Sequence, residues 1–250
     1  MRSIATTVSF VVLAAFLAPA AHAQTSKFEL RPQLTQEEFK EFAADLGSML
    51  RFRQPGDAPT LGRGNVDLSV ELANTPTTQS SRAWNNTMTA PAAGHRLGPN
   101  MSFPRIVARV GVNDRMDIGA WGGLNPNGNY GLVGVDTKIA LVREGRSSPV
   151  SISVRPSITS LVGPSDVWAG NVSVDLAVSR AFGRLVPYGG IAASSSAAIE
   201  RSAALDLDPA TAGETSAYGG VAYRWRSLLV SGDVEKGNQT TYAIRVGTRF

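Results

Sequence analysis

Apolar and polar residues alternate along most of the chain. From Val66 to Leu72 apolar residues occupy every second position, and Asp67, Ser69 and Glu71 lie between them. A period of two sends neighbouring side chains to opposite faces of a β-strand. The same alternation recurs in the segments 105–112, 116–120, 133–141, 150–158, 172–178, 185–193, 221–225, 228–235 and 242–250. The pattern predicts about ten strands, of which 185–193 is the weakest and is rich in glycine.

Most connections between these strands alternate in length, although 236–239, on the side of the longer ones, is brief. Short connections at 113–114, 143–148, 180–183 and 226–227 would share one side, and the long segments 75–102 and 195–214 would lie on the other. Membrane barrels combine short periplasmic turns with longer outer loops, and their apolar face meets lipid. A soluble β-sandwich also alternates, but it would bury the charged chain end at Phe250. The sequence therefore predicts an all-β fold: a transmembrane antiparallel up-and-down β-barrel of about ten strands with a short N-terminal α-helix.

That helix is predicted from a change of period before the first strand. Its apolar residues recur every three or four positions, and they are Phe39, Phe42, Ala43, Leu46, Met49 and Leu50. Thr35 and Glu38 have the spacing of a capping box, so the helix should begin at Thr35 and end near Phe52. It could lie on the membrane surface, cap or enter the barrel from the periplasm, or bind a periplasmic partner. We expect a lid packed on the barrel.

The first residues have the pattern of a secretory signal peptide. Arg2 precedes an apolar run from Val8 to Leu17, and Ala21-His22-Ala23 fits the cleavage motif. The run is too short for a membrane-spanning helix, which needs about 20 residues, although a membrane anchor is the alternative. We predict a signal peptide (1–23), a periplasmic segment with the helix (24–61) and an outer-membrane barrel (62–250).

With the apolar residues facing outward, thirteen charged residues should face the lumen. They are Asp67, Glu71, Arg105, Arg109, Asp117, Asp136, Lys138, Arg155, Asp175, Asp233, Glu235, Arg245 and Arg249. Acidic and basic positions fall on neighbouring strands, and closure would bring the last strand beside the first. A barrel of about eight to ten strands is barely wider than its side chains, and buried charges must be paired. We expect a salt-bridged filling; a narrow path for ions or small solutes is the alternative.

Few residues are suited to catalysis, metal binding or nucleic-acid binding. The chain lacks cysteine, and its one histidine after the signal peptide is His95, in a long connection. Ser80, Ser81 and Asp166 could approach it only if separate loops fold together, so no triad is indicated. The net charge is +4, but the basic residues form no run. We predict no enzyme activity, cofactor, metal or nucleic-acid partner.

Aromatic residues indicate where the membrane surfaces lie. Trp168 is at one end of its predicted strand, and Tyr223 and Trp225 are at the other end of theirs. Trp and Tyr favour the membrane–water interface, so these residues predict two girdles. Trp84 and Trp121 do not fit either girdle, being in a loop and inward-facing.

The last strand carries a resemblance to a known class. Tyr242, Ile244, Val246, Thr248 and Phe250 alternate up to an aromatic chain end, and the segment 111–119 looks like a periplasmic hairpin. In these features the chain resembles the small, porin-like bacterial outer-membrane β-barrel proteins. The resemblance implies that the last strand is the signal read by the barrel-insertion machinery, and that outer-membrane lipids surround the protein. It does not imply one activity. We expect a non-enzymatic outer-membrane protein with surface-exposed loops; a narrow porin-like channel and a lipid-modifying enzyme are the alternatives.

Overall fold

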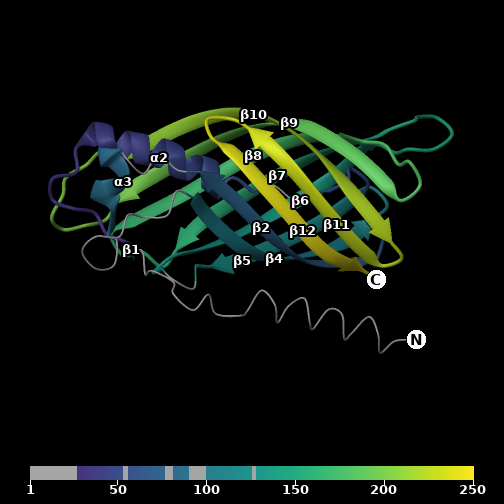
Figure 1. Ribbon diagram of the computed structural model, residues 1–250, viewed down its shortest axis with the longest axis horizontal. Helices are drawn as coiled ribbons and strands as arrows, with labels where there is room; N and C mark the ends of the chain where they lie inside the picture. The colour runs from purple at the N-terminus through teal and green to yellow at the C-terminus, as the bar shows by residue number, and fades with distance from the viewer. Residues whose placement is uncertain (1–26, 53–55, 77–80, 90–99, 126–127) are drawn as a thin grey trace.

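The computed structural model describes residues 27–52, 56–76, 81–89, 100–125 and 128–250, which form a closed barrel of ten strands (Figure 1). The strands are β2 (Val66–Pro76), β4 (Asn100–Asn113), β5 (Met116–Leu124), β6 (Gly131–Val142), β7 (Ser151–Val162), β8 (Val167–Ser179), β9 (Leu185–Glu200), β10 (Ala210–Trp225), β11 (Leu228–Lys236) and β12 (Thr240–Arg249). Each pairs antiparallel with the next, and β12 closes the barrel on β2. The predicted fold class and strand number are confirmed.

The register of the closing pair matches the predicted charge pattern. Arg245 lies opposite Glu71, and Arg249 lies opposite Asp67. A closed barrel has no free strand edge, so each strand pairs its backbone on both sides. Strands can cross the hydrocarbon of a membrane only when paired in this way, because no water is present there to bind their backbone amide and carbonyl groups.

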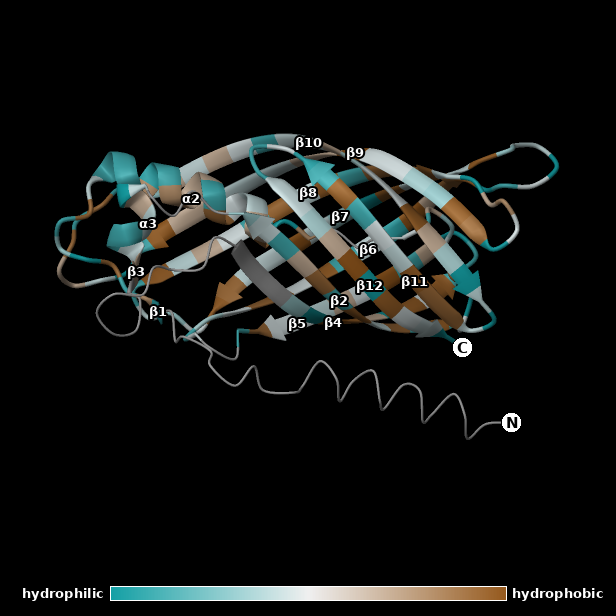
Figure 2. Cartoon of the chain, viewed as in Figure 1, coloured by the Kyte–Doolittle hydropathy of each residue, from teal (hydrophilic) through white to brown (hydrophobic). Residues whose placement is uncertain are grey.

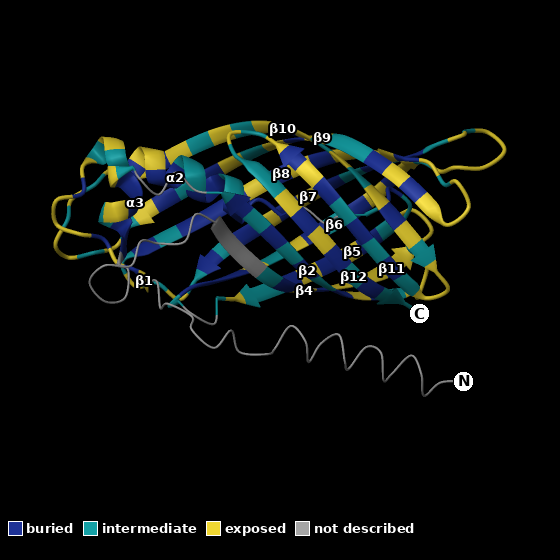
Figure 3. Cartoon of the chain, in the orientation of Figure 1, coloured by how far each residue is buried: buried dark blue, intermediate teal, exposed yellow. Residues whose placement is uncertain are grey.

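Hydrophobic and hydrophilic residues alternate along the strands of the barrel (Figure 2), and the large hydrophobic ones are those whose side chains are exposed on its outer face. On β8, Val172, Val174 and Leu176 are exposed, whereas Ser173 and Asp175 between them are buried. Figure 3 shows the same alternation of buried and exposed residues along the other strands. Every strand exposes a large apolar side chain, for example Leu68, Ile106, Ile118, Val133, Ile158, Val172, Ile191, Val221, Val234 and Ile244. A continuous apolar belt of this kind is foreign to a water-soluble monomer and matches the lipid-facing surface of a membrane barrel.

Strands β9 and β10 are much longer than their sequence pattern indicates. Each has 16 residues. The sequence pattern misses their full length because small inward residues such as Ala192, Ser196 and Ala212 hide the alternation. The inward side chains of this wall are small because helix α2 (Gln36–Leu50) packs against it. A β-carbon on Gly47 of the helix would lie 2.2 Å from the Ser196 hydroxyl oxygen, so both positions must stay small.

The predicted helix is present, but not on the predicted side. The capping box forms, because Thr35 Oγ1 accepts from the Glu38 amide at 3.3 Å and the Thr35 amide donates to Glu38 Oε2 at 3.1 Å. The sequence predicts the helix on the side of the short turns, whereas the structure places it at the end of the long connections (Figure 1). The cause is a pairing between distant segments: β1 (Lys27–Phe28) pairs with β3 (Met88–Thr89), which belongs with α3 (Arg82–Thr87) to the connection between β2 and β4. Neither of the described helices is long and apolar enough to cross a membrane.

Candidate functional site: the plugged lumen

Helix α2 fills the mouth of the barrel with apolar side chains. Phe39, Phe42 and Leu46 are almost completely buried, so they do not lie on a membrane surface. The Phe42 ring contacts those of Phe28 and Trp84, with centroids 5.7 Å and 5.2 Å away. The strands contribute Leu132, Leu161, Val167, Ala169, Ala198 and Ala210 to this cluster. The lumen at the long-connection end is therefore an apolar core.

The chain then continues from the helix down into the lumen. We call residues 51–61 the lumen segment, of which the structure describes 51, 52 and 56–61. Arg51 forms a buried ion pair with Glu235 of β11. Phe52 stacks on Trp121 of β5, with ring centroids 3.4 Å apart, and the Arg155 guanidinium lies 5.6 Å from the centre of the Phe52 ring. A plug of the chain's own residues thus replaces water at mid-barrel.

Below this level, Asp57 anchors the lumen segment to the barrel wall. Its fully buried carboxylate pairs with Arg249 at 2.8 Å and also with Arg224. Lys138 Nζ donates to the carbonyls of Asp57 and Pro59 at 3.1 Å and 3.4 Å. The anchor therefore draws on cations from three strands, β6, β10 and β12.

The lumen segment leaves the barrel beside the short turn between β4 and β5. The Leu61 amide donates to both carboxylate oxygens of Asp117, at 3.0 Å and 3.1 Å. The Gly64 amide donates to the carbonyl of Gly111 at 2.8 Å. Gly111 has no room for a side chain, because a β-carbon there would lie 1.9 Å from the carbonyl oxygen of Gly62. The chain before β2 thus crosses the lumen from the long-connection end to the short-turn end.

The structure places twelve of the thirteen predicted lumen charges among its buried residues, and the thirteenth, Arg249, has a side chain 25% exposed. Several of them join strand to strand. The pairs are Glu71–Arg105 at 3.5 Å, Arg109–Asp136 at 2.5 Å, Arg155–Asp175 at 3.2 Å, Asp67–Arg249 at 2.9 Å, and Asp67–Arg245. These pairs brace the wall of the barrel.

One of these pairs reaches across an intervening strand. Arg109 of β4 lies in register with Asp67 but pairs with Asp136 of β6, passing over β5. The space comes from Gly119, because a β-carbon there would lie 2.4 Å from Asp136 Oδ1 and 2.9 Å from Arg109 Nη2. This glycine therefore selects the partner of Arg109.

The other predicted charges contact different groups. Asp117, Lys138 and Glu235 hold the lumen segment, as described above. Asp233 accepts a hydrogen bond from Tyr188 at 2.9 Å. The sequence patterns did not identify Arg51, Asp57 or Arg224 as lumen residues. Arg51 and Asp57 lie in a segment without periodicity, so the sequence pattern does not show that they are buried. The one sequence feature that could have indicated it is the occurrence of charged residues near Phe52 in a segment that is neither helix nor strand.

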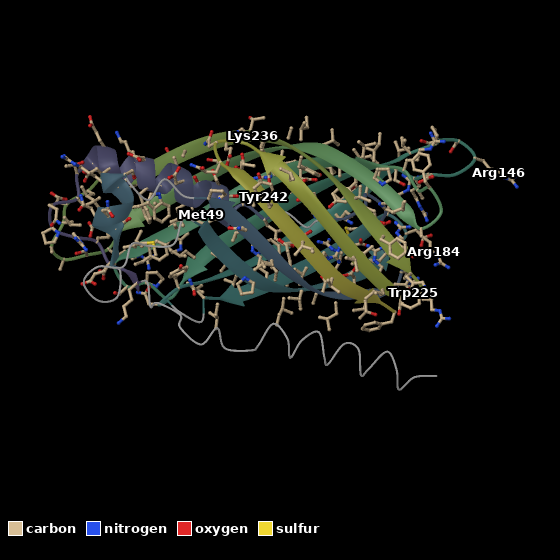
Figure 4. All side chains as sticks on the ribbon, in the orientation of Figure 1. Met49, Arg146, Arg184, Trp225, Lys236 and Tyr242 are labelled. Atoms are coloured by element: carbon tan, nitrogen blue, oxygen red, sulfur yellow. The ribbon has the colours of Figure 1, made fainter. Side chains whose placement is uncertain are left out.

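A small cavity remains between the end of α2 and the wall. Its lining includes Met49, Arg51, Glu71, Arg105 and Glu235, and Arg105 Nη2 donates to the Met49 carbonyl at 3.1 Å. Figure 4 labels Met49 near the long-connection end. The space is on the order of a single water molecule.

The candidates for catalysis are not brought together as far as the structure describes them. His95 and Ser80 lie outside the described residues, as does the predicted signal peptide, 1–23. Ser81 is the N-cap of α3, and Asp166 accepts from its neighbour Ser165 at 2.6 Å. Among the described residues, no group of three His, Asp or Glu side chains is placed to hold a metal ion.

The residues of the predicted insertion signal lie on the outer face of β12 and at the chain end. Tyr242, Ile244 and Phe250 are 52%, 50% and 67% exposed, and Val246 and Thr248 between them are half-buried. Trp225 and Tyr223 are exposed at the same end of the barrel as Phe250, where a girdle is predicted.

Three solved structures resemble the chain at low sequence identity. No protein-family model matches the chain, and no curated protein matches it in sequence. An outer membrane channel from Pseudomonas putida F1 is similar, with 11% identity, a TM-score of 0.47, and coverage of 80% of this chain and 100% of the channel. The attachment invasion locus protein Ail of Yersinia pestis shows 12% identity, a TM-score of 0.36 and coverage of 75% and 99%. LpxR from Salmonella typhimurium shows 6% identity, a TM-score of 0.40 and coverage of 73% and 99%. With its closed ten-stranded barrel and apolar outer belt, the chain has the fold of the bacterial outer-membrane β-barrel proteins.

Proposed function

We propose that the chain is a non-enzymatic integral protein of the bacterial outer membrane. It is exported through a cleaved signal peptide, its lumen is closed by its own N-terminal segment, and its long connections make contacts at the cell surface. The observation that carries this proposal is the lumen segment. It fills the barrel and is anchored by Arg51 at one level and by Asp57 at another.

The two ends of the lumen are closed by different physical means. At the long-connection end, α2 buries an aromatic and aliphatic cluster, which excludes water because apolar surface is more stable when it is removed from water. At the short-turn end, charged side chains are paired with each other or with the lumen segment. A solute crossing the barrel would have to displace both layers, which supports a closed state at rest.

Planar lipid bilayers test this proposal with wild-type protein and a variant lacking residues 27–60. Heat-dependent gel mobility first checks that each barrel is folded. We expect no steady conductance from the wild type and unitary conductance from the deletion variant. Steady unitary conductance of the wild type would refute the closed lumen. Silence of a folded deletion variant would show that the lumen segment is not what closes it.

A double variant, Arg51→Gln with Asp57→Asn, tests the same point without a deletion. It leaves the chain length and the apolar cluster unchanged and removes both ionic anchors. We expect brief openings that the wild type does not show. A folded double variant as silent as the wild type would contradict the anchoring.

A gated channel is the second candidate. Its support is the polar character of the wall behind the lumen segment, where Arg109, Asp136, Arg155 and Asp175 remain paired with one another. If the lumen segment moved out, a charged path would remain open. Conductance that appears in the wild type only above a threshold voltage, or only on addition of a ligand, would favour this candidate over the first.

A further inference from the structure

The short-turn end of the barrel is encircled by exposed arginines. Each of its four turns carries at least one, and so does the chain entering β2. These residues are Arg115 (β4–β5), Arg143 and Arg146 (β6–β7), Arg180 and Arg184 (β8–β9), Arg226 (β10–β11) and Arg63 before β2. We call them the arginine ring. Figure 4 shows Arg146 and Arg184 at this end, remote from Met49.

Little acidic charge offsets the ring. In the same turns the acidic side chains are Asp114 and Glu144. Among the described residues, only Arg143 of the ring has a side-chain carboxylate within 4.0 Å, that of Asp114. The opposite end exposes acidic residues, including Glu37, Glu41, Asp206 and Asp208. The opposite end also exposes cations such as Arg31, Lys40 and Arg201, so it is the excess of positive over negative charge that is specific to the short-turn end.

Aromatic residues hold part of the ring at the edge of the apolar belt. The Arg180 guanidinium lies 5.0 Å from the centre of the Phe182 ring, and that of Arg226 lies 5.8 Å from the Trp225 ring. Arg184 Nη1 donates to the Tyr223 hydroxyl at 3.5 Å. Exposed aromatic side chains beside an apolar belt occupy the headgroup level of a bilayer. The guanidinium groups are thus placed where lipid phosphates lie.

We propose that the arginine ring binds the phosphate groups of anionic glycerophospholipids in the leaflet around the short-turn end. A guanidinium presents a planar fork of donors that matches two phosphate oxygens. A zwitterionic headgroup carries an ammonium that opposes the positive ring, whereas phosphatidylglycerol does not, so the ring selects net negative lipids. This inference rests on the proposed membrane insertion and adds the class of lipid and the residues that bind it.

Quenching of Trp225 by brominated lipids tests the proposal. All variants carry Trp168→Phe, because Trp168 lies on the lipid face at the other end and would also be quenched. Trp84 and Trp121 are buried in the lumen and out of reach of the lipid. The protein is reconstituted into phosphatidylcholine vesicles with increasing fractions of brominated phosphatidylglycerol, or of brominated phosphatidylcholine as reference. We expect phosphatidylglycerol to be preferred at the Trp225 site by roughly fivefold for each arginine that contacts it. The preference should fall at about 1 M salt, where charges are screened over about 3 Å.

A matched pair of triple variants locates the effect. Arg180→Gln, Arg184→Gln and Arg226→Gln together should abolish the preference. Arg31→Gln, Lys40→Gln and Arg201→Gln remove the same charge from the exposed surface of the other end and should leave it intact. Equal loss in both variants would mean that net charge alone, and not the ring, attracts the lipid, and would overturn the proposal.

The other outcomes are also decisive. If neither brominated lipid quenches Trp225, the protein has not inserted, and the proposed function fails together with this inference. If both lipids quench equally, the protein is inserted but the ring does not select anionic lipid, and only this inference fails. If equal quenching is accompanied by sedimentation with purified cell-wall sacculi that the first triple variant loses, the ring binds cell-wall polymer instead of lipid. That result would also overturn the proposal.

Discussion

Replacing Asp57 by Asn should loosen the lumen segment while leaving the barrel folded. The Asp57 side chain is fully buried, and its partners Arg224 and Arg249 are 34% and 25% exposed. Removing one partner of a fully buried ion pair costs about 3–5 kcal/mol. Because water can rehydrate these two arginines in part, the expected cost is lower, about 2–3 kcal/mol. That loss corresponds to a roughly 30- to 160-fold rise in the equilibrium constant for displacement of the lumen segment.

Hydrogen exchange of the Ala58 amide measures this change directly. That amide is buried and donates to Ser179 Oγ at 3.0 Å, so it exchanges only when the lumen segment moves. Its protection should fall by the factor given above, whereas amides of the central strands should keep theirs. Asp114→Asn is the control, because Asp114 and Arg143 are 74% and 58% exposed at 4.0 Å and such a surface pair contributes about 0–1 kcal/mol. Unchanged protection at Ala58, or an equal loss throughout the barrel, would refute the reasoning.

Four further changes test other parts of the structure. Gly119→Val should force apart the ion pair that crosses β5 and destabilise the barrel by about 3–5 kcal/mol; a denaturant midpoint equal to that of the wild type would contradict the crossing. Val174→Arg, at an exposed outward position of β8, should cost about 2–4 kcal/mol in folding into lipid vesicles if it faces mid-membrane, and a neutral result would place this face in water. Deleting Phe250 should prevent assembly in the outer membrane while export continues, so normal membrane levels of the truncated protein would refute the insertion signal. The hydrogen bond from the Thr35 amide, with a further one from Asn86, holds the pKa of Glu38 below its ordinary value of 4.5. The stabilisation from the charged carboxylate is present above pH 4.5 and is lost as the pH falls through the lowered pKa. A carboxyl titration midpoint at or above 4.5, measured by NMR, would contradict the capping box.

The sequence predicts the barrel well because each strand has one face toward lipid and the other toward a polar lumen. Alternation such as that of Val172 with Ser173 is set by lipid on one side and lumen on the other. The sequence of each strand therefore shows which of its residues face outward and which face inward. The up-and-down order alone places the strand of Glu71 beside that of Arg105. Closure of the barrel likewise places β12 beside β2, whereas the register of each pair comes from the structure.

The lumen segment could not be predicted in this way. It is irregular, so no period shows which of its side chains are buried, and Asp57 appears in the sequence as part of a loop. The strands that make room for α2 lose their pattern for a related reason, since inward residues such as Ser196 and Ala212 must be small. The side on which α2 lies depends on the pairing of β1 with β3, two segments distant in the sequence and too short to carry an alternation.

Cross-linking of the lumen segment to the wall tests its position most directly. The chain contains no cysteine, so Ala58→Cys with Ser179→Cys introduces the only two thiols, at positions joined by a hydrogen bond of 3.0 Å. After mild oxidation of the folded protein, mass spectrometry should find these two cysteines joined in one disulfide and closed to maleimide. Two thiols that stay free and react with maleimide in a folded barrel would show that the N-terminal segment lies outside the lumen.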